Sequence, residues 1–287
     1  MELHSHRMTA LVLLMAAVAL AGCRPEAEVA GGALDATDGD PPATRTALDP
    51  AAASAPITLE DVMEFDPRYL IGISYPPGME RYPGLAAELR RYAEAARAEL
   101  MAAVEDLGPS SEDRMRAPYD LALSFDLLME TPEIVAVQAG GSLYTGGAHG
   151  IPLVARFVWL PQRDEMLTAA SLFQGREGWH EVSAFVRESL HTSLSQRLEA
   201  DALAPADRFR LLASGGEMID EGTAPEAGNF AQFEPVPGVD GRLRALRFVF
   251  PPYQVGPYSD GVQTVEVPSA VLLPHLSPEY RGLFAAG

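Results

Sequence analysis

The sequence contains no lysine and a single cysteine, and both shortages exclude chemistry. All 21 basic residues are arginine. Phosphate-binding P-loops, Schiff-base catalysis and Ser-Lys hydrolysis each require a lysine, so none of these mechanisms is available. Cys23 is the only thiol, which excludes an internal disulfide and a zinc site built from several cysteines. A hydrophobic core must therefore stabilise the fold.

Positive charge is scarce as well. The chain has 40 acidic residues against 21 basic ones, and its formal net charge is −19 at pH 7. Such an excess repels nucleic acid and anionic lipid surfaces, and it attracts cationic partners. The same excess also serves solubility alone, and the composition leaves both roles open. We therefore expect no nucleic-acid partner.

The N-terminus has the features of a targeting segment. Its apolar run, residues 10–21, is too short to span a bilayer but suits the hydrophobic region of a signal peptide. The run ends in Leu20-Ala21-Gly22-Cys23, which resembles the lipobox of bacterial lipoproteins. This resemblance implies a signal peptide at residues 1–22 and a lipid on Cys23. The alternative is an unprocessed apolar N-terminus with an incidental cysteine.

Arg24 follows the cysteine, where the usual lipoprotein sorting pattern would place Asp to retain a protein in the inner membrane. The resemblance thus implies an exported protein anchored in the outer membrane and facing the periplasm. Residues 23–56 are rich in Ala, Pro, Gly, Asp and Thr and hold few large apolar side chains. Such a composition cannot bury enough surface to fold, so we expect a flexible tether.

The remaining residues mix helical and strand periodicities in an irregular order. We expect helices at 83–106, 177–198 and, more briefly, 205–212. We expect strands at 64–75, 119–127, 134–144, 153–159, 229–233, 243–250 and 262–267. This mixture, with short links between strands, is typical of an α+β fold with largely antiparallel sheets packed by two main helices. We further expect a small N-terminal α+β subdomain at 57–116 and a larger α+β domain at 117–287.

The loop SLYTGGAHGI, residues 142–151, holds three glycines and His149 between two expected strands. Gly146 and Gly147 can expose backbone N–H groups to an anion beside a titratable imidazole. Alternatively, the glycines only permit positive φ angles, and the histidine bonds to neighbouring backbone. Catalysis at His149 would also require a nucleophile or a metal, for which the sequence has no specific candidate.

Two other segments carry residue types that occur in functional sites. His180-Glu181 begins like a zinc-protease motif, but Ala184 stands where the second histidine belongs, so no metal site is expected. Tyr253 and Tyr258 lie in a proline-rich connection between two expected strands. Tyrosine offers a large contact area at low entropic cost, so both are candidate partner contacts, with packing as the alternative.

Several motifs between residues 117 and 276 occur in an order that resembles a known family. They are Ser142-x-Tyr144-x-Gly146-Gly147-Ala148-His149, then Leu167-Thr168 with Leu172-Phe173, Asn229-Phe230, Phe250-Pro-Pro-Tyr253-Gln-Val255-Gly-Pro257-Tyr258-x-x-Gly261 and Val265-x-Val267-Pro268. Together they resemble the domain of unknown function in the extracellular part of RsiV-type lysozyme-sensing anti-sigma factors. The same domain accompanies the catalytic part of PdaC-type peptidoglycan deacetylases. Gly150-Ile151 departs from the Pro-Asn that usually follows the histidine in that family.

The resemblance implies a lipid-anchored binding protein of the cell envelope that recognises a lysozyme-like cationic protein or peptidoglycan. We recognise neither deacetylase metal-ligand motifs nor a sigma-binding segment, and we expect no catalysis, no cofactor and no metal. The candidate ligand contacts or structural hallmarks are Tyr144, Gly146, Gly147, His149, Tyr253 and Tyr258. The alternatives are a hydrolase or metal-dependent enzyme that uses His149, and an envelope assembly factor.

Overall fold

The computed structural model describes residues 57–107, 118–201 and 203–286. They belong to one compact unit that begins at Ala53. The expected signal peptide, the lipidation site at Cys23 and the tether lie outside these residues. No helix in the described ranges is long and apolar enough to cross a membrane.

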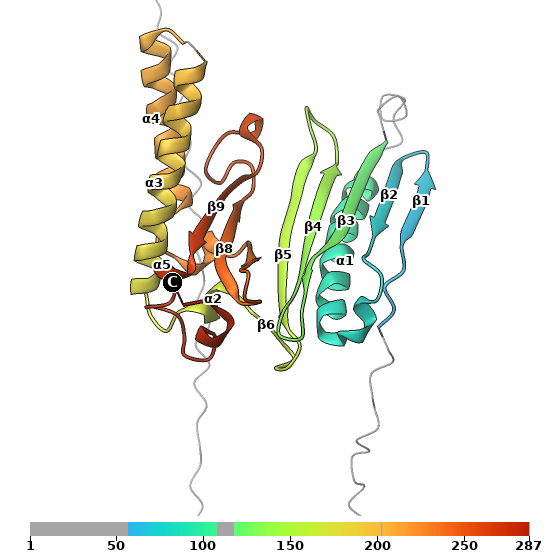
Figure 1. Ribbon diagram of the computed structural model, residues 1–287. Coiled ribbons are helices and arrows are strands. Elements are labelled where there is room, and N and C mark those ends of the chain that lie inside the picture. Colours follow the sequence, from blue (N-terminus) through green and yellow to red (C-terminus); the bar gives the residue numbers. More distant parts are fainter. Residues whose placement is uncertain (1–56, 108–117, 202, 287) are drawn as a thin grey trace, which may run out of the picture. The chain divides into compact units, whose positions relative to one another are not determined.

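A six-stranded sheet forms the first part of the unit, with its strands side by side in chain order (Figure 1). The strands are β1 (Val62–Asp66), β2 (Tyr69–Ser74), β3 (Tyr119–Glu130), β4 (Val135–Tyr144), β5 (Ile151–Leu160) and β6 (Glu165–Met166). Neighbours are antiparallel except β2 and β3, which are parallel. Parallel neighbours need a crossover, and α1 (Pro83–Glu105) lies in the chain between them.

Helix α1 packs its apolar stripe against this sheet. Leu85, Leu89 and Leu100 of the helix are fully buried, together with Leu121 of β3 and Leu143 of β4. One core thus joins residues on both sides of the expected domain boundary at 116, and one sheet spans it. The boundary therefore does not separate two sheets or two cores.

The expected strand at 64–75 is wrong, because this segment spans two strands of a hairpin. Asp66 pairs with Tyr69 across a two-residue turn, and the Asp66 carboxylate accepts a hydrogen bond of 2.9 Å from the Arg68 backbone N–H. The turn is encoded by Asp66-Pro67, since an aspartate before proline favours turn initiation. The apolar residues beyond it obscured this signal.

A three-stranded antiparallel sheet forms the second part, in the order β7 (Phe233–Pro237), β8 (Leu243–Phe250) and β9 (Gln263–Pro268). The long helix α3 (Glu177–Ala200) packs against β9, and α4 (Pro205–Gly222) lies beside α3 (Figure 1). The short helices α2 (Ala169–Leu172) and α5 (Ser269–Leu272) complete this part. Its core stacks Trp179 on Phe230, and both meet Phe248 edge-on.

Helix α4 is much longer than the expected 205–212. Gly215 and Gly216 look like helix breakers in sequence, yet they lie inside the helix at its contact with α3. A Cβ atom on Gly215 would lie 2.9 Å from a methyl group of Leu194, so glycine permits the close approach. The expected strand at 229–233 is also wrong. Residues Ala227–Phe230 form a 3-10 helix, and the strand begins at Phe233.

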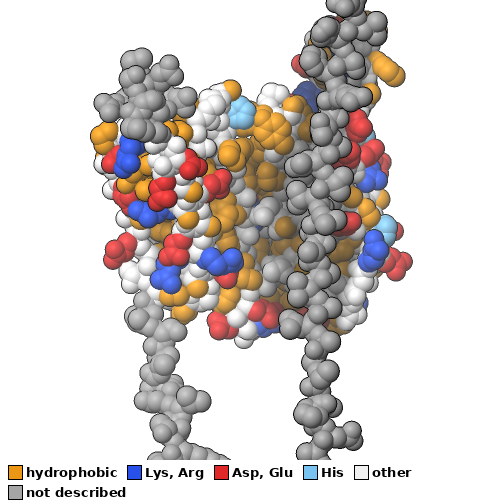
Figure 2. Space-filling view, turned by 180° about the vertical axis from the view of Figure 1, so that it is seen from behind, with side chains coloured by type: hydrophobic (Ala, Val, Ile, Leu, Met, Phe, Trp, Pro, Cys, Tyr) orange, Lys and Arg blue, Asp and Glu red, His pale blue; other side chains and the backbone are white. Residues whose placement is uncertain are grey.

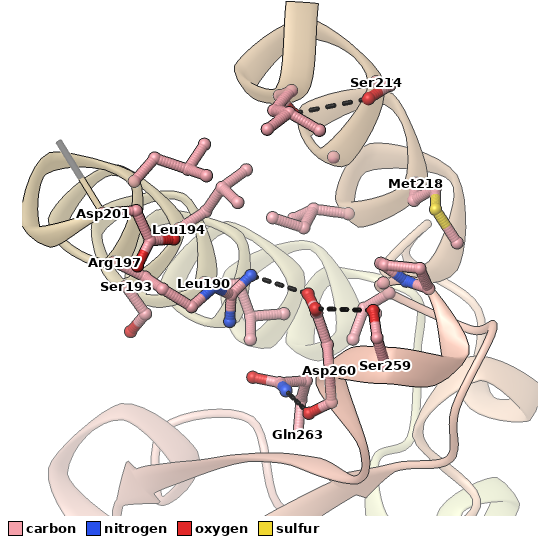
Figure 3. Close-up of a pocket in the computed structure, with 17 residues that line it drawn as sticks. Leu190, Ser193, Leu194, Arg197, Asp201, Ser214, Met218, Ser259, Asp260 and Gln263 are labelled. Carbon is pink, nitrogen blue, oxygen red and sulfur yellow. Dashed lines mark hydrogen bonds and ion pairs between the residues drawn. The ribbon is translucent and has the colours of Figure 1, made fainter. Parts of the chain in front are cut away.

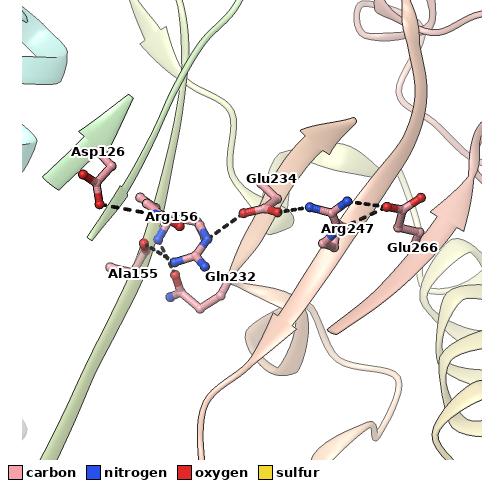
Figure 4. A network of polar contacts seen from close by, with 8 residues as sticks. Asp126, Ala155, Arg156, Gln232, Glu234, Arg247 and Glu266 are labelled. Carbon is pink, nitrogen blue, oxygen red and sulfur yellow. Dashed lines mark hydrogen bonds and ion pairs between the residues drawn. The ribbon is translucent and has the colours of Figure 1, made fainter. Parts of the chain in front are cut away.

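The two sheets are joined by a chain of charged side chains (Figure 4). Arg156 of β5 donates to Glu234 of β7 at 2.9 Å, and Arg247 of β8 donates to the other oxygen of Glu234 at 2.6 Å. The Arg156 and Glu234 side chains are only 12% and 11% exposed. Hydrogen bonding from Arg247, followed by the charges of Arg247 and Arg244, lowers the pKa of the Glu266 carboxyl on β9. The buried pair of Arg156 and Glu234 therefore joins the two sheets, and Arg247 links Glu234 to Glu266 within the three-stranded sheet.

The α+β class with largely antiparallel sheets is confirmed. Two long helices, α1 and α3, pack on the sheets as expected, and the third long helix, α4, packs on α3. On the face shown in Figure 2, hydrophobic side chains gather along the middle, and acidic and basic side chains are interspersed toward the sides.

Candidate functional site

The loop between β4 and β5 carries the glycines and His149. Its glycines adopt φ angles of 104° at Gly146 and 94° at Gly147, which a side chain would strain. The Tyr144 hydroxyl donates a hydrogen bond of 3.2 Å to the carbonyl oxygen of Gly147, closing the loop from the end of β4. Ala148 and His149 are exposed at its tip. The loop thus presents the imidazole to solvent.

The connection between β8 and β9 begins with a turn across Pro251–Gln254. The Gln254 N–H donates to the Pro251 carbonyl at 3.1 Å, and Tyr253 has a φ of 73°. A type II turn has a hydrogen bond between its first and fourth residues, often a proline in the second position, and a positive φ in the third. The segment has all three features. That third position favours glycine or asparagine. Here it holds tyrosine, whose backbone is therefore strained.

These two segments, 104 residues apart, meet at three aromatic side chains. The Tyr253 hydroxyl lies 3.0 Å from His149 Nε2. The Tyr258 ring stacks on the imidazole, with 4.0 Å between ring centroids and 17° between planes. Tyr253 is 55% exposed and Tyr258 is 38% exposed. We call His149, Tyr253 and Tyr258 the aromatic patch.

The hydrogen bonds around His149 assign its neutral tautomer. Nδ1 lies 3.1 Å from the carbonyl oxygen of Gly150, which can only accept, so Nδ1 carries the proton. Nε2 then accepts from the Tyr253 hydroxyl. Both ring nitrogens are engaged, and the imidazole plane is fixed against Tyr258. Gly150 accepts this bond through its carbonyl oxygen, and the next residue, Ile151, is exposed and begins β5.

The side chain of Gln254, next to Tyr253, ties the connection that carries the patch to two neighbouring segments. Its amide nitrogen donates to the carbonyl oxygens of Gly222 at 2.9 Å and Asn229 at 2.8 Å. The Asn229 side chain in turn donates to the Ala224 carbonyl at 2.9 Å. Segments holding three of the sequence motifs, at Tyr144–His149, Asn229–Phe230 and Phe250–Gly261, therefore meet in one region. Sequence order alone does not reveal this meeting.

The remaining motif residues and histidines lie elsewhere. Thr168 caps α2 in a capping box with Ser171, a structural role. His180 is exposed at the start of α3, and His191 bonds Asp220 of α4 at 3.1 Å. The described residues contain no group of three or more His, Cys, Asp or Glu placed to hold a metal.

No family model matches the chain, and no curated protein matches it. Among solved structures, the chain is similar to a DUF3298 family protein from Pseudomonas aeruginosa PAO1. That match has 17% identity and a TM-score of 0.47, and it covers 81% of this chain and 99% of that one. A member of the DUF3298 family from Bacteroides fragilis NCTC 9343 matches with 16% identity and a TM-score of 0.42, over 75% of this chain and 87% of that one.

Proposed function

We propose that this chain is a lipid-anchored binding protein of the cell envelope and that the aromatic patch is its partner-contact surface. The observation that carries the proposal is Tyr253, an exposed aromatic residue held by His149 in a turn position that favours glycine. Strained residues persist where the surroundings hold them in place, and they cluster at ligand clamps and active sites. Exposed, rigid tyrosines are the side chains that most often dominate binding energy.

We infer that the partner is a cationic, lysozyme-like protein. A net charge of −19 accelerates association with a basic protein, in a manner that salt weakens. The ring faces of Tyr253 and Tyr258 attract arginine and lysine side chains through their negative quadrupoles. The net charge thus accelerates the encounter with the partner, and the aromatic patch makes the specific contacts.

The test measures binding of hen egg-white lysozyme to the purified protein at low and at physiological salt. We expect Tyr253→Ala and Tyr258→Ala each to weaken binding by about thirtyfold, the loss typical of a hot-spot residue. Phe65→Ala is the matched control, since Phe65 is 76% exposed on β1 and outside the patch. No binding at low salt would rule out this partner, and binding unaffected by both tyrosine variants would rule out this surface.

Peptidoglycan is the second partner that the patch fits. The His149 and Tyr258 rings are stacked nearly parallel, and this stack presents a flat aromatic surface against which the C–H groups of a sugar ring can pack. Retention on purified sacculi, lost in Tyr258→Ala but not in Phe65→Ala, would identify this ligand. If the protein binds neither sacculi nor lysozyme, peptidoglycan and lysozyme-like proteins are both excluded as its partners.

A hydrolase is the alternative from another class, and one contact favours it. The Tyr253 hydroxyl donates to His149, whose other nitrogen is oriented by the Gly150 carbonyl, as in a nucleophile activated by an oriented base. Tyr253→Phe separates the two functions, because it keeps the ring and removes the hydroxyl. Binding that survives in this variant while a hydrolytic activity on peptidoglycan disappears would favour the enzyme. Hydrolytic activity in His149→Ala equal to that of the unmodified protein would rule out the hydrolase hypothesis.

A further inference from the structure

A cavity of about 440 Å³ lies between α3, α4 and the connection from β8 to β9. Leu190 and Leu194 of α3, Met218 and Ile219 of α4, and Val255 of the connection give it apolar walls (Figure 3). Neither Tyr253 nor Tyr258 lines it, although Pro257 and Ser259, on either side of Tyr258, do. Its volume falls within the range of roughly 300–1,000 Å³ typical of small-molecule sites.

Charged and polar groups gather at one side of this cavity. Arg197 of α3 donates to Asp260 of the connection at 2.7 Å, and Figure 3 shows the two side chains pointing toward one another. Gln263 donates to the backbone carbonyl of Asp260 at 2.7 Å, which fixes the segment that carries the carboxylate. Asp201, one turn after Arg197, also lines the cavity. The lining thus holds two carboxylates against one guanidinium.

These charges select the head group of a ligand. Arg197 already pairs with Asp260, and the Asp201 carboxylate makes no hydrogen bond or ion pair with any other described residue. An anionic head group would meet two carboxylates, whereas a cationic one would gain Asp201 as a partner. The net charge of the whole chain acts in the same direction.

We propose that this cavity binds a small amphipathic molecule with an aliphatic chain and a cationic head group. The chain replaces water along the leucine-rich walls, and the head group lies beside Asp201 and Asp260. The connection presents Val255 and Asp260 to the cavity, whereas Tyr253 and Tyr258 belong to the aromatic patch. The cavity can therefore be tested independently of the partner proposed for the patch.

The test compares dodecyltrimethylammonium with dodecanoate, two probes of equal chain length and opposite charge, by isothermal titration calorimetry of the purified protein below micelle-forming concentrations. We expect the cationic probe to bind about tenfold more tightly, because the lining carries one net negative charge. Ser193→Trp should abolish binding, since Ser193 lines the cavity and a large ring there fills it. Thr192→Trp is the matched control, exposed on the same helix and outside the lining.

A charge variant keeps the proposal falsifiable if Ser193→Trp does not fold. The double variant Asp201→Asn with Asp260→Asn leaves Arg197 as the only charge in the lining, and we expect dodecanoate then to bind more tightly than the cationic probe. Loss of binding in Ser193→Trp but not Thr192→Trp, together with this reversal, would support the proposal. The proposal would be overturned if neither probe binds, or if the unmodified protein binds dodecanoate more tightly than the cationic probe. It would also be overturned if both tryptophan variants bind the cationic probe as tightly as the unmodified protein.

Discussion

The positive φ angle at Tyr253 should cost the fold stability, because a side chain is strained there. The difference in stability between Tyr253→Gly and Tyr253→Ala measures this cost. Both substitutions remove the ring and its hydrogen bond to His149. Only alanine keeps a Cβ atom at a φ of 73°. A side chain in this region costs on the order of 1–2 kcal/mol, and glycine's greater freedom in the unfolded chain offsets less than that. We therefore expect the glycine variant to be more stable than the alanine variant by about 1 kcal/mol.

Urea denaturation followed by circular dichroism measures this difference, because ring loss is common to both variants and cancels. With a slope of about 3 kcal/mol per molar urea, the two midpoints should differ by about 0.3 M at equal slopes. Both variants should lose binding through the aromatic patch to the same extent. An alanine variant as stable as the glycine variant would show that the turn is unstrained, and it would remove the argument that tyrosine is kept there for binding.

Three further substitutions test the frame that holds the patch. Gly141→Ala should destabilise by at least about 3 kcal/mol in urea denaturation, since its Cβ atom would lie 1.9 Å from a backbone oxygen of β3; Gly140→Ala, with nothing within 4 Å, is its control. Glu234→Gln should cost about 3 kcal/mol by leaving the buried Arg156 without its charge partner, and a loss below about 1 kcal/mol would contradict the role of the network. The lowered pKa of Glu266 stabilises the fold above its unfolded-state value of about 4.3, and this contribution disappears as the pH falls through the folded value. The stability difference between the protein and Glu266→Gln should therefore be constant above about pH 5 and shrink below about pH 4, and a difference independent of pH would refute this.

Strands with one buried face were predictable because their side chains alternate. The pattern from Tyr119 onward located β3, and the apolar run at 243–250 matches β8 to the residue. Prediction failed where tertiary contact decides the outcome. Helix α4 continues through Gly215 and Gly216, which lie against Leu194 and His191 of α3, and no local signal in the sequence carries that information.

The candidate site shows the same division. The sequence named His149, Tyr253 and Tyr258 separately, from a glycine-rich loop and a proline-rich connection. Their contact depends on how the connection from β8 to β9 folds back toward the loop between β4 and β5, which periodicity does not encode. The pair of Arg197 and Asp260 beside the cavity was missed, because single charges 63 residues apart form no pattern.

If the aromatic patch binds a cationic partner, the dissociation constant for lysozyme depends directly on its two tyrosines. Lysozyme binding is measured at physiological salt for the unmodified protein, for the double variant Tyr253→Ala with Tyr258→Ala, and for Phe65→Ala. We predict a loss of at least about a hundredfold in the double variant and an unchanged value in Phe65→Ala. An equal dissociation constant in all three proteins would contradict the claim.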